Sequence, residues 1–311
     1  MEYRHTPVLL AEVLQQLSPH PGSVIVDCTL GGAGHAKRIA DLLAPTGTLV
    51  GIDQDDAALI AARDTLRLGQ HAFLIKGNFG ELDRLLTEAS LAYVDGFLFD
   101  LGVSSHQLDF AERGFSYQTD APLDMRMDPS AGGITAADVV SSYQESQLAR
   151  VIRVYGEERW ASRIAAFIVA ARARRPVATT LELVEVIKNA VPAAARRGGP
   201  HPARRTFQAL RIEVNQELEV LEGALRAAVR WLSPRGRIVV ISYHSLEDRV
   251  VKRVFADLAR GCICPPEIPV CTCGNEPVLR VLTSRPVTPT AEEVEANPRA
   301  RSAKLRAAEK L

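Results

Sequence analysis

The sequence predicts an α/β fold in which helices cover a parallel sheet and a helical insertion interrupts the alternation. Three observations predict it. Strand and helix patterns alternate with short connections from residue 24 to residue 101, as in successive βαβ units. Between about residues 110 and 207 only helical periodicity and loops remain. The α/β pattern then resumes, so the chain predicts one core in two parts, 1–109 and 208–311, around an inserted helical domain, 110–207.

The first part begins with an amphipathic stretch and continues with four strand patterns. The stretch covers Pro7 to Leu17, and the predicted strands are Val24–Thr29, Thr48–Asp53, Phe73–Gly77 and Gly96–Leu101. The helices between them are expected at Ala36–Leu43, Asp56–Leu68 and Leu82–Ala89. Such alternation implies a parallel sheet with helices on both faces and right-handed crossovers.

The insertion and the second part follow from periodicity and breaker residues. Predicted insertion helices are Thr135–Ser142, Glu145–Val154, Arg159–Arg172 and Thr180–Ala190, with Thr179 and Thr180 as N-cap candidates. Beyond it, the pattern predicts a long helix from Gln208 to Leu232, a strand Arg237–Ser242 and a helix from Ser245 to Ala259. Val278–Val287 and Ser302–Ala308 are candidates for a closing antiparallel pair.

A glycine-rich turn between the first strand and its helix predicts a ligand site. The run from Asp27 to His35 holds three glycines in four positions, which permit positive φ and close approach of a bound molecule. The helix that follows points N–H groups at an anionic or carboxylate-bearing ligand. Asp53 ends the next strand, where nucleoside-binding α/β folds place a ribose-hydroxyl acceptor. Together they predict a nucleoside cofactor.

Two further strand ends carry reactive side chains. Ligands bind beyond the carboxyl ends of strands in open α/β sheets, and the run Asp100 to Asp109 follows the fourth strand there. Tyr243 and His244 follow the fifth strand and are expected to face the cleft. Ser245 has a simpler interpretation, since a serine with an acid three residues later is typical of a helix start.

Charge is segregated along a chain that is neutral overall, with 37 basic and 37 acidic side chains. Residues 1–149 hold 9 Lys+Arg and 20 Asp+Glu, whereas residues 150–211 hold 13 and 4. Arginine supplies twelve of those thirteen, and its planar fork suits phosphate, so the segment predicts a nucleic-acid surface over a merely solvated face. No apolar run approaches bilayer length and the start lacks a signal-peptide pattern, so a cytoplasmic protein without membrane contact is expected.

A loop after the fourth strand is dense in aromatic and charged residues. Phe115 or Tyr117 could stack on a flipped base while Arg113 or Arg126 meets phosphate. Each aromatic is equally well explained as a core residue.

Five cysteines are present, and four form a Cys-x-Cys, six-residue, Cys-x-Cys block: Cys262, Cys264, Cys271 and Cys273. Zinc bound by four thiolates is the functional interpretation, and reduced thiols in a loop are the alternative that we favour, because the pairs are spaced more tightly than usual. The fifth, Cys28, is expected to be core filler.

The chain resembles the bacterial small-subunit ribosomal RNA cytosine-N4 methyltransferases (RsmH, formerly MraW) over nearly its whole length. The matching runs are His5 to Leu10, Asp27 to His35, Asp100 to Asp109, Arg113 to Tyr117, Pro122 to Asp128, Tyr155 to Arg159, Arg205 to Gln208, Ser242 to Arg249 and Asn297 to Ser302. The resemblance implies a Rossmann-like S-adenosylmethionine-dependent methyltransferase core with an inserted helical domain. It also implies methylation of a cytidine in the decoding region of 16S ribosomal RNA, in the small ribosomal subunit, and leaves a homodimer open.

Residue roles follow from the same resemblance. The family's cofactor contacts fall on Ala33, Gly34, His35, Asp53, Phe79, Asp100 and Gln107. Ala33 stands where many members have glycine, which leaves a backbone contact but puts a tighter approach in doubt. Asp100 is expected to accept the amine N–H bonds and His244 to orient the base or help the proton leave. Ser104, Ser105, Arg113, Phe115, Tyr117, Arg126 and Tyr243 are the expected substrate contacts. The cysteine block occurs in only some members, which argues against a catalytic metal.

Three other functions compete. A DNA amino-methyltransferase usually has Pro-Pro-aromatic after the strand-four acid or asparagine, whereas this chain has Leu101-Gly102-Val103. A nicotinamide-dependent dehydrogenase would use the same turn and Asp53 but leaves the arginines unexplained. An RNA-binding assembly factor with a structural nucleoside is the non-enzymatic alternative. The sequence does not choose between naked RNA and an assembled subunit as acceptor.

Overall fold

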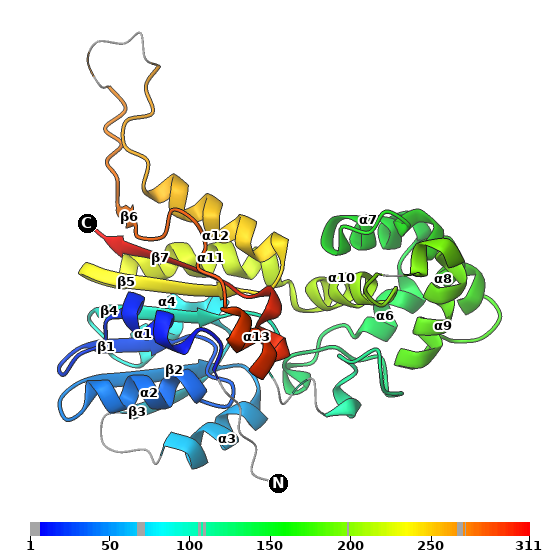
Figure 1. The fold of residues 1–311 in the computed structure, drawn as a ribbon, viewed down its shortest axis with the longest axis horizontal. Coiled ribbons are helices and arrows are strands. Elements are labelled where there is room, and N and C mark those ends of the chain that lie inside the picture. The colour runs from blue at the N-terminus through cyan, green and yellow to red at the C-terminus, as the bar shows by residue number, and fades with distance from the viewer. Residues whose placement is uncertain are drawn as a thin grey trace. The chain divides into compact units, whose positions relative to one another are not determined.

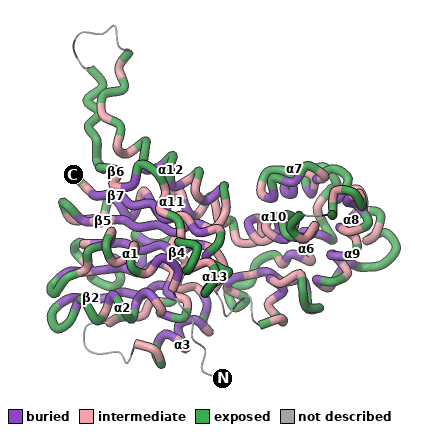
Figure 2. Tube along the Cα trace, viewed as in Figure 1, coloured by how far each residue is buried: buried purple, intermediate pink, exposed green. Residues whose placement is uncertain are grey.

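The chain forms two compact units in the computed structural model, which describes residues 7–66, 72–104, 107, 110–197, 199–265, 270 and 272–311. The sheet unit comprises the chain up to Gly102 and from Leu218 onward, and the helical unit comprises Val103–Glu217. Figure 1 shows the course of the chain and Figure 2 its burial, with the strands of the sheet largely buried. The functional division predicted at 109/110 and 207/208 stays a prediction.

The sheet unit is built on seven strands in the order β3-β2-β1-β4-β5-β7-β6. The strands are β1 Val24–Asp27, β2 Thr48–Asp53, β3 Ala72–Lys76, β4 Val94–Asp100, β5 Leu232–Ser242, β6 Leu279–Val281 and β7 Lys304–Lys310. The first five are parallel, and β7 runs antiparallel to both β5 and β6. The predicted α/β fold and closing antiparallel pair are therefore confirmed.

Helices cover both faces of this sheet. They are α1 Leu10–Leu17, α2 Gly34–Leu43, α3 Asp56–Leu66, α4 Leu82–Glu88, α11 Glu217–Trp231, α12 Ser245–Leu258 and α13 Ala291–Ala296. One core packs α4, α11 and α12 on the sheet, and another packs α1, α2 and α3. Alternation along β4 supplies both, since Phe97 and Phe99 lie in the first core and Leu98 in the second.

In the described residues of the helical unit, five helices pack around an apolar core. They are α6 Ala136–Ser142, α7 Glu145–Gly156, α8 Ala161–Arg172, α9 Thr180–Ala190 and α10 Arg204–Asn215. Capping boxes start three of them: Thr135 with Asp138 begins α6, Gln144 with Gln147 begins α7, and Thr179 with Glu182 begins α9. The predicted helical insertion is confirmed.

One predicted element is wrong. The expected continuous helix from Gln208 to Leu232 is two helices, because Gln216 adopts a left-handed conformation (φ 50°) that ends α10 before α11 begins. Arg211 holds the break by a bidentate ion pair to Glu217, with N···O distances of 2.7 and 2.8 Å. Among the described residues, no helix has the length and apolarity to cross a membrane.

Candidate active site

Three acids stand at the carboxyl ends of adjacent parallel strands in the sheet unit. Asp27 ends β1, Asp53 ends β2 and Asp100 ends β4, and the sheet order places β1 between the other two. Burial first, and then the charges of Asp100 and Asp53, raise the pKa of Asp27. Chain topology thus gathers three carboxyl groups, from positions far apart in sequence, at the edge where α/β sheets bind ligands.

Asp53 connects the glycine-rich turn to the sheet by a hydrogen bond. Its Oδ2 accepts a hydrogen bond from the Gly31 N–H at 2.8 Å, and its Oδ1 accepts one from the Asp55 N–H at 2.9 Å. Burial raises the pKa of Asp53 to about 6. Each carboxylate oxygen accepts more than one hydrogen bond, so these two leave Asp53 able to accept from ribose hydroxyls as well.

The turn itself needs positive φ at two positions, and only one is glycine. Gly31 has φ 49° and Ala33 has φ 60°, the latter fully buried just before α2 begins at Gly34. A Cβ added at Gly32 would contact nothing within 4 Å, so the turn faces open space there. The first turn of α2 directs N–H groups without intrahelical acceptors toward this space. Alanine at position 33 therefore preserves the backbone shape expected of glycine.

The sequence identified Asp27 only as the acid that ends the first strand. Its side chain is only 2% exposed and accepts a hydrogen bond from the Thr29 N–H at 3.1 Å. Burial raises the pKa of Asp27 to about 7, despite an opposing attraction to His35. The sequence could have indicated this buried carboxyl group, because Asp27 directly follows the apolar residues of a strand.

Asp100 is the most connected of the three acids. Its Oδ1 accepts the Tyr243 hydroxyl at 2.8 Å, and its Oδ2 lies 3.5 Å from His35 Nδ1. Its backbone N–H donates to Thr29 Oγ1 at 2.6 Å. Burial, followed by the charge of Asp100, raises the pKa of Tyr243 well above its usual value, so the tyrosine remains a neutral donor.

His35 contributes a side chain that sequence reasoning missed, since only its backbone N–H was assigned. Its Nε2 lies 2.9 Å from the Val8 carbonyl oxygen. A carbonyl oxygen only accepts, so Nε2 carries a proton and Nδ1 faces Asp100. The Nδ1 edge of the buried imidazole is therefore the edge that meets the carboxylate.

His244 proves to be the N-cap of α12, so the assignment of that position to Ser245 is wrong. Its Nδ1 accepts the Glu247 N–H at 3.3 Å, while Glu247 Oε2 accepts the N–H groups of His244 and Tyr243 at 3.2 and 2.8 Å. The buried Glu247 is the reciprocal partner that makes the histidine an effective cap. The predicted catalytic role of His244 stays a prediction.

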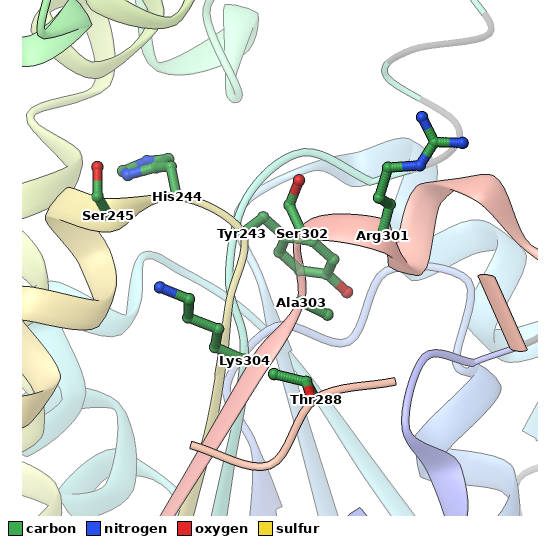
Figure 3. A pocket seen from close by; sticks show the side chains of 8 residues that line it. All are labelled: Tyr243, His244, Ser245, Thr288, Arg301, Ser302, Ala303 and Lys304. Atoms are coloured by element: carbon green, nitrogen blue, oxygen red, sulfur yellow. The ribbon is translucent and has the colours of Figure 1, made fainter. Parts of the chain in front are cut away.

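Figure 3 shows a pocket of about 340 Å³ beside Tyr243 and His244. The remaining lining residues are Ser245, Thr288, Arg301, Ser302, Ala303 and Lys304. Two cations, the exposed Arg301 and the half-buried Lys304, thus share a hollow with two hydroxyl groups from Ser245 and Ser302. Lys304 Nζ also lies 3.5 Å from Asp248 Oδ2. Such side chains bind phosphate groups, and Figure 3 shows the Arg301 guanidinium and the Lys304 ammonium pointing in different directions.

Phe79 begins a short 3-10 helix, Phe79–Glu81, after β3. Its ring meets that of Phe99 edge to face, with centroids 5.8 Å apart, and remains half-buried. The neighbouring Gly80 and Glu81 line a second hollow of about 400 Å³ with residues of α11. The position of Phe79 is compatible with packing on a flat ring such as adenine.

The other predicted residues lie in the helical unit, except Ser105, which is outside the described residues. Ser104 and Gln107 bind reciprocally: Ser104 Oγ accepts the Gln107 N–H at 3.2 Å, and Gln107 Oε1 accepts the Ser104 N–H at 3.1 Å. Gln107 is buried. These contacts fix the loop backbone that follows β4.

The aromatic and arginine candidates of that unit make internal contacts. Phe115 is 7% exposed and packs in the core of the helical unit, and its expected stacking on a base stays a prediction. Tyr117 is half-buried and stacks on His201 at 4.8 Å between centroids. Arg113 Nη2 donates to the carbonyl groups of Arg126 and Met127. Arg126 itself forms a bidentate pair with Asp124, at 2.9 and 2.7 Å.

Comparison with known proteins gives one consistent result. The model of the MraW methylase family matches residues 2–311. A ribosomal RNA small subunit methyltransferase H from Geobacter sulfurreducens is 58% identical over 312 residues, covering 100% of both chains. Proteins of the same name from Geotalea daltonii and Heliobacterium modesticaldum are 57% and 54% identical, covering 100% of this chain and 99% and 100% of theirs.

Proposed function

The chain belongs to the MraW methylase family, and we propose that it transfers a methyl group from S-adenosylmethionine to the N4 amine of a cytidine in the decoding region of 16S ribosomal RNA. The observation that carries the proposal is 58% identity, over the full length of both chains, to a protein named ribosomal RNA small subunit methyltransferase H. The three strand-end acids and the glycine-rich turn supply the matching chemistry.

The residues of the turn fit S-adenosylmethionine. The N–H groups of Gly34 and His35, at the start of α2, suit its carboxylate, and Asp53 suits its ribose hydroxyls. Phe79 would pack on the adenine. When bound, the cofactor supplies a methyl group activated by a positively charged sulfur.

The acceptor amine requires help because its lone pair is delocalised into the cytosine ring. Asp100 can accept an N–H of the amine and let the nitrogen pyramidalise toward the methyl group. Tyr243 holds the Asp100 carboxylate in place by its 2.8 Å hydrogen bond. The cofactor would supply the methyl group, and Asp100 would take the proton that the amine gives up; its Oδ2 lies 3.5 Å from His35 Nδ1. His244 remains the alternative group for orienting the base.

Substrate binding draws on the pocket and the helical unit. The Arg301 and Lys304 pocket can hold an RNA phosphate near Tyr243. The arginine-rich segment 150–211 would carry further phosphate contacts, and the target base must leave its stack to reach the acids. The substrate would then be the small ribosomal subunit or its RNA, and the protein would act in the cytoplasm, alone or as a homodimer.

The test is transfer of labelled methyl groups from S-adenosylmethionine to small ribosomal subunits and, in parallel, to naked 16S RNA. Digestion to nucleosides and mass spectrometry should find the label on N4-methylated cytidine. Absence of label from cytidine would overturn the enzyme assignment in favour of an assembly factor, and label on adenosine would redirect it to another amine. The Asp100→Asn variant provides the background rate.

A further inference from the structure

The segment from residue 259 to 278 connects α12 to β6. Its described residues include no helix or strand, and Figure 1 shows them running out from the sheet unit. Two of its largest apolar side chains, Ile263 and Val270, are 58% and 70% exposed. Burial of these two side chains therefore does not stabilise the described part of the segment.

Three cysteines nevertheless converge there. The Sγ atoms of Cys262, Cys264 and Cys273 all lie within 4.8 Å of one another, and those of Cys262 and Cys273 are 3.8 Å apart. A disulfide would need about 2.05 Å. Thiolates around zinc at about 2.3 Å place neighbouring sulfur atoms about 3.8 Å apart, which is the distance between Cys262 and Cys273.

Backbone groups support the sulfur atoms as well. The N–H groups of Ile263 and Asn275 each lie 3.4 Å from Cys273 Sγ, as donors to a charged thiolate would. The Thr272 hydroxyl also lies 3.6 Å from Cys264 Sγ. The Asn275 side chain closes the base of the segment by donating to the carbonyl groups of Arg260 and Gly261 at 2.9 and 2.7 Å.

We propose that Cys262, Cys264 and Cys273 bind a structural zinc ion that holds residues 259–265 and 272–278 together. The sequence alone makes zinc the less favoured alternative, and the convergence of the thiols now favours it. Cys271, the fourth cysteine of the block, lies outside the described residues. The site is separate from the acid cluster, because α12 begins beside His244 and its 14 residues span about 21 Å before the segment starts. The metal would thus stabilise the chain without taking part in methyl transfer.

The first test measures zinc in the full-length protein purified without chelator, by plasma mass spectrometry. One zinc ion per chain is expected, with loss of the metal in Cys264→Ser and Cys273→Ser. Cys28→Ala is the matched control, because Cys28 is buried in the sheet core and should leave the zinc content unchanged. Less than about half an equivalent in the wild type, or full zinc in Cys264→Ser, would overturn the proposal.

Three further measurements distinguish a metal site from a disulfide and from a loop of reduced thiols. Cobalt substitution should give the visible spectrum of a tetrahedral thiolate complex, and this spectrum should weaken in Cys273→Ser. Chelation should increase proteolytic cleavage between residues 259 and 278 while leaving the rest of the chain intact, whereas an unchanged cleavage pattern would contradict the structural role. An intact mass lighter by two hydrogen atoms, indicating a disulfide between Cys262 and Cys273, would also contradict it.

Discussion

Replacing Asp100 with asparagine removes the negative charge that we place opposite the acceptor amine. Asparagine keeps the shape and one oxygen, so the hydrogen bond from Tyr243 at 2.8 Å can persist. What disappears is the charged acceptor, together with the electrostatic partner of His35 at 3.5 Å. Loss of one preorganised electrostatic contact in a water-poor site costs about 3–4 kcal/mol, so the methyl-transfer rate should fall by about 10²–10³-fold.

The rate is measured in a single turnover, with enzyme in excess over RNA and cofactor at saturation, so that binding and product release do not contribute. Asp95→Asn is the matched control. Asp95 belongs to the same strand but accepts hydrogen bonds from the Val24 N–H and the Ser233 hydroxyl at the other end of the sheet, at 2.9 and 2.6 Å. It should lose stability and keep the rate. A wild-type rate in Asp100→Asn would refute the assignment of the acceptor.

Three more outcomes are expected. An unfolded aspartate ionises near pH 4 and Asp27 in the folded protein only near 7, so stability falls as pH rises through this range, by about 4 kcal/mol for a single group. Asp27→Asn should flatten that slope and raise the free energy of unfolding at pH 8 but not at pH 4, as urea titrations would show. Gln216→Gly should stabilise the protein by about 1 kcal/mol, because the exposed Gln216 holds φ 50°. Gln15→Gly, within α1, should destabilise the protein by a similar amount. A change of the same sign in the free energy of unfolding of both variants would contradict this account. Arg301→Ala should weaken RNA binding and lower the slope of log affinity against log salt concentration by about 1. Arg38→Ala, which replaces an exposed arginine elsewhere, should leave the slope unchanged. An unchanged slope in Arg301→Ala would show that Arg301 does not contact phosphate.

The local pattern of apolar and capping residues was sufficient to predict most of the helices and strands. The spacing of apolar residues located β2 at Thr48–Asp53 without error, and Thr179 was one of two N-cap candidates for α9, because caps depend on residues close together in the chain. The break at Gln216 escaped detection because a left-handed glutamine has no sequence signature. Periodicity continued across the break, since both helices bury apolar faces.

Local sequence likewise identified some residues of the candidate site and missed others. Asp53 and Asp100 were identified because each ends a strand, which is a local property. The His35 imidazole was missed, because its contact with Asp100 joins residues 65 positions apart and depends on the order of β1 and β4. Phe115 was ambiguous in the sequence and became a core residue only when its neighbours were known.

The sequence by itself determined the α/β alternation, the helical insertion, the glycine-rich turn and the acids at the strand ends, because these depend on residues close together in the chain. Only the tertiary structure decided which side chains meet. It placed Asp27 between two other acids and buried it enough to shift its pKa, gave Asp100 the partners Tyr243 and His35, and brought the cysteine thiols within metal-binding range. Burial and long-range contact arise from packing of the whole chain, so no local pattern encodes them.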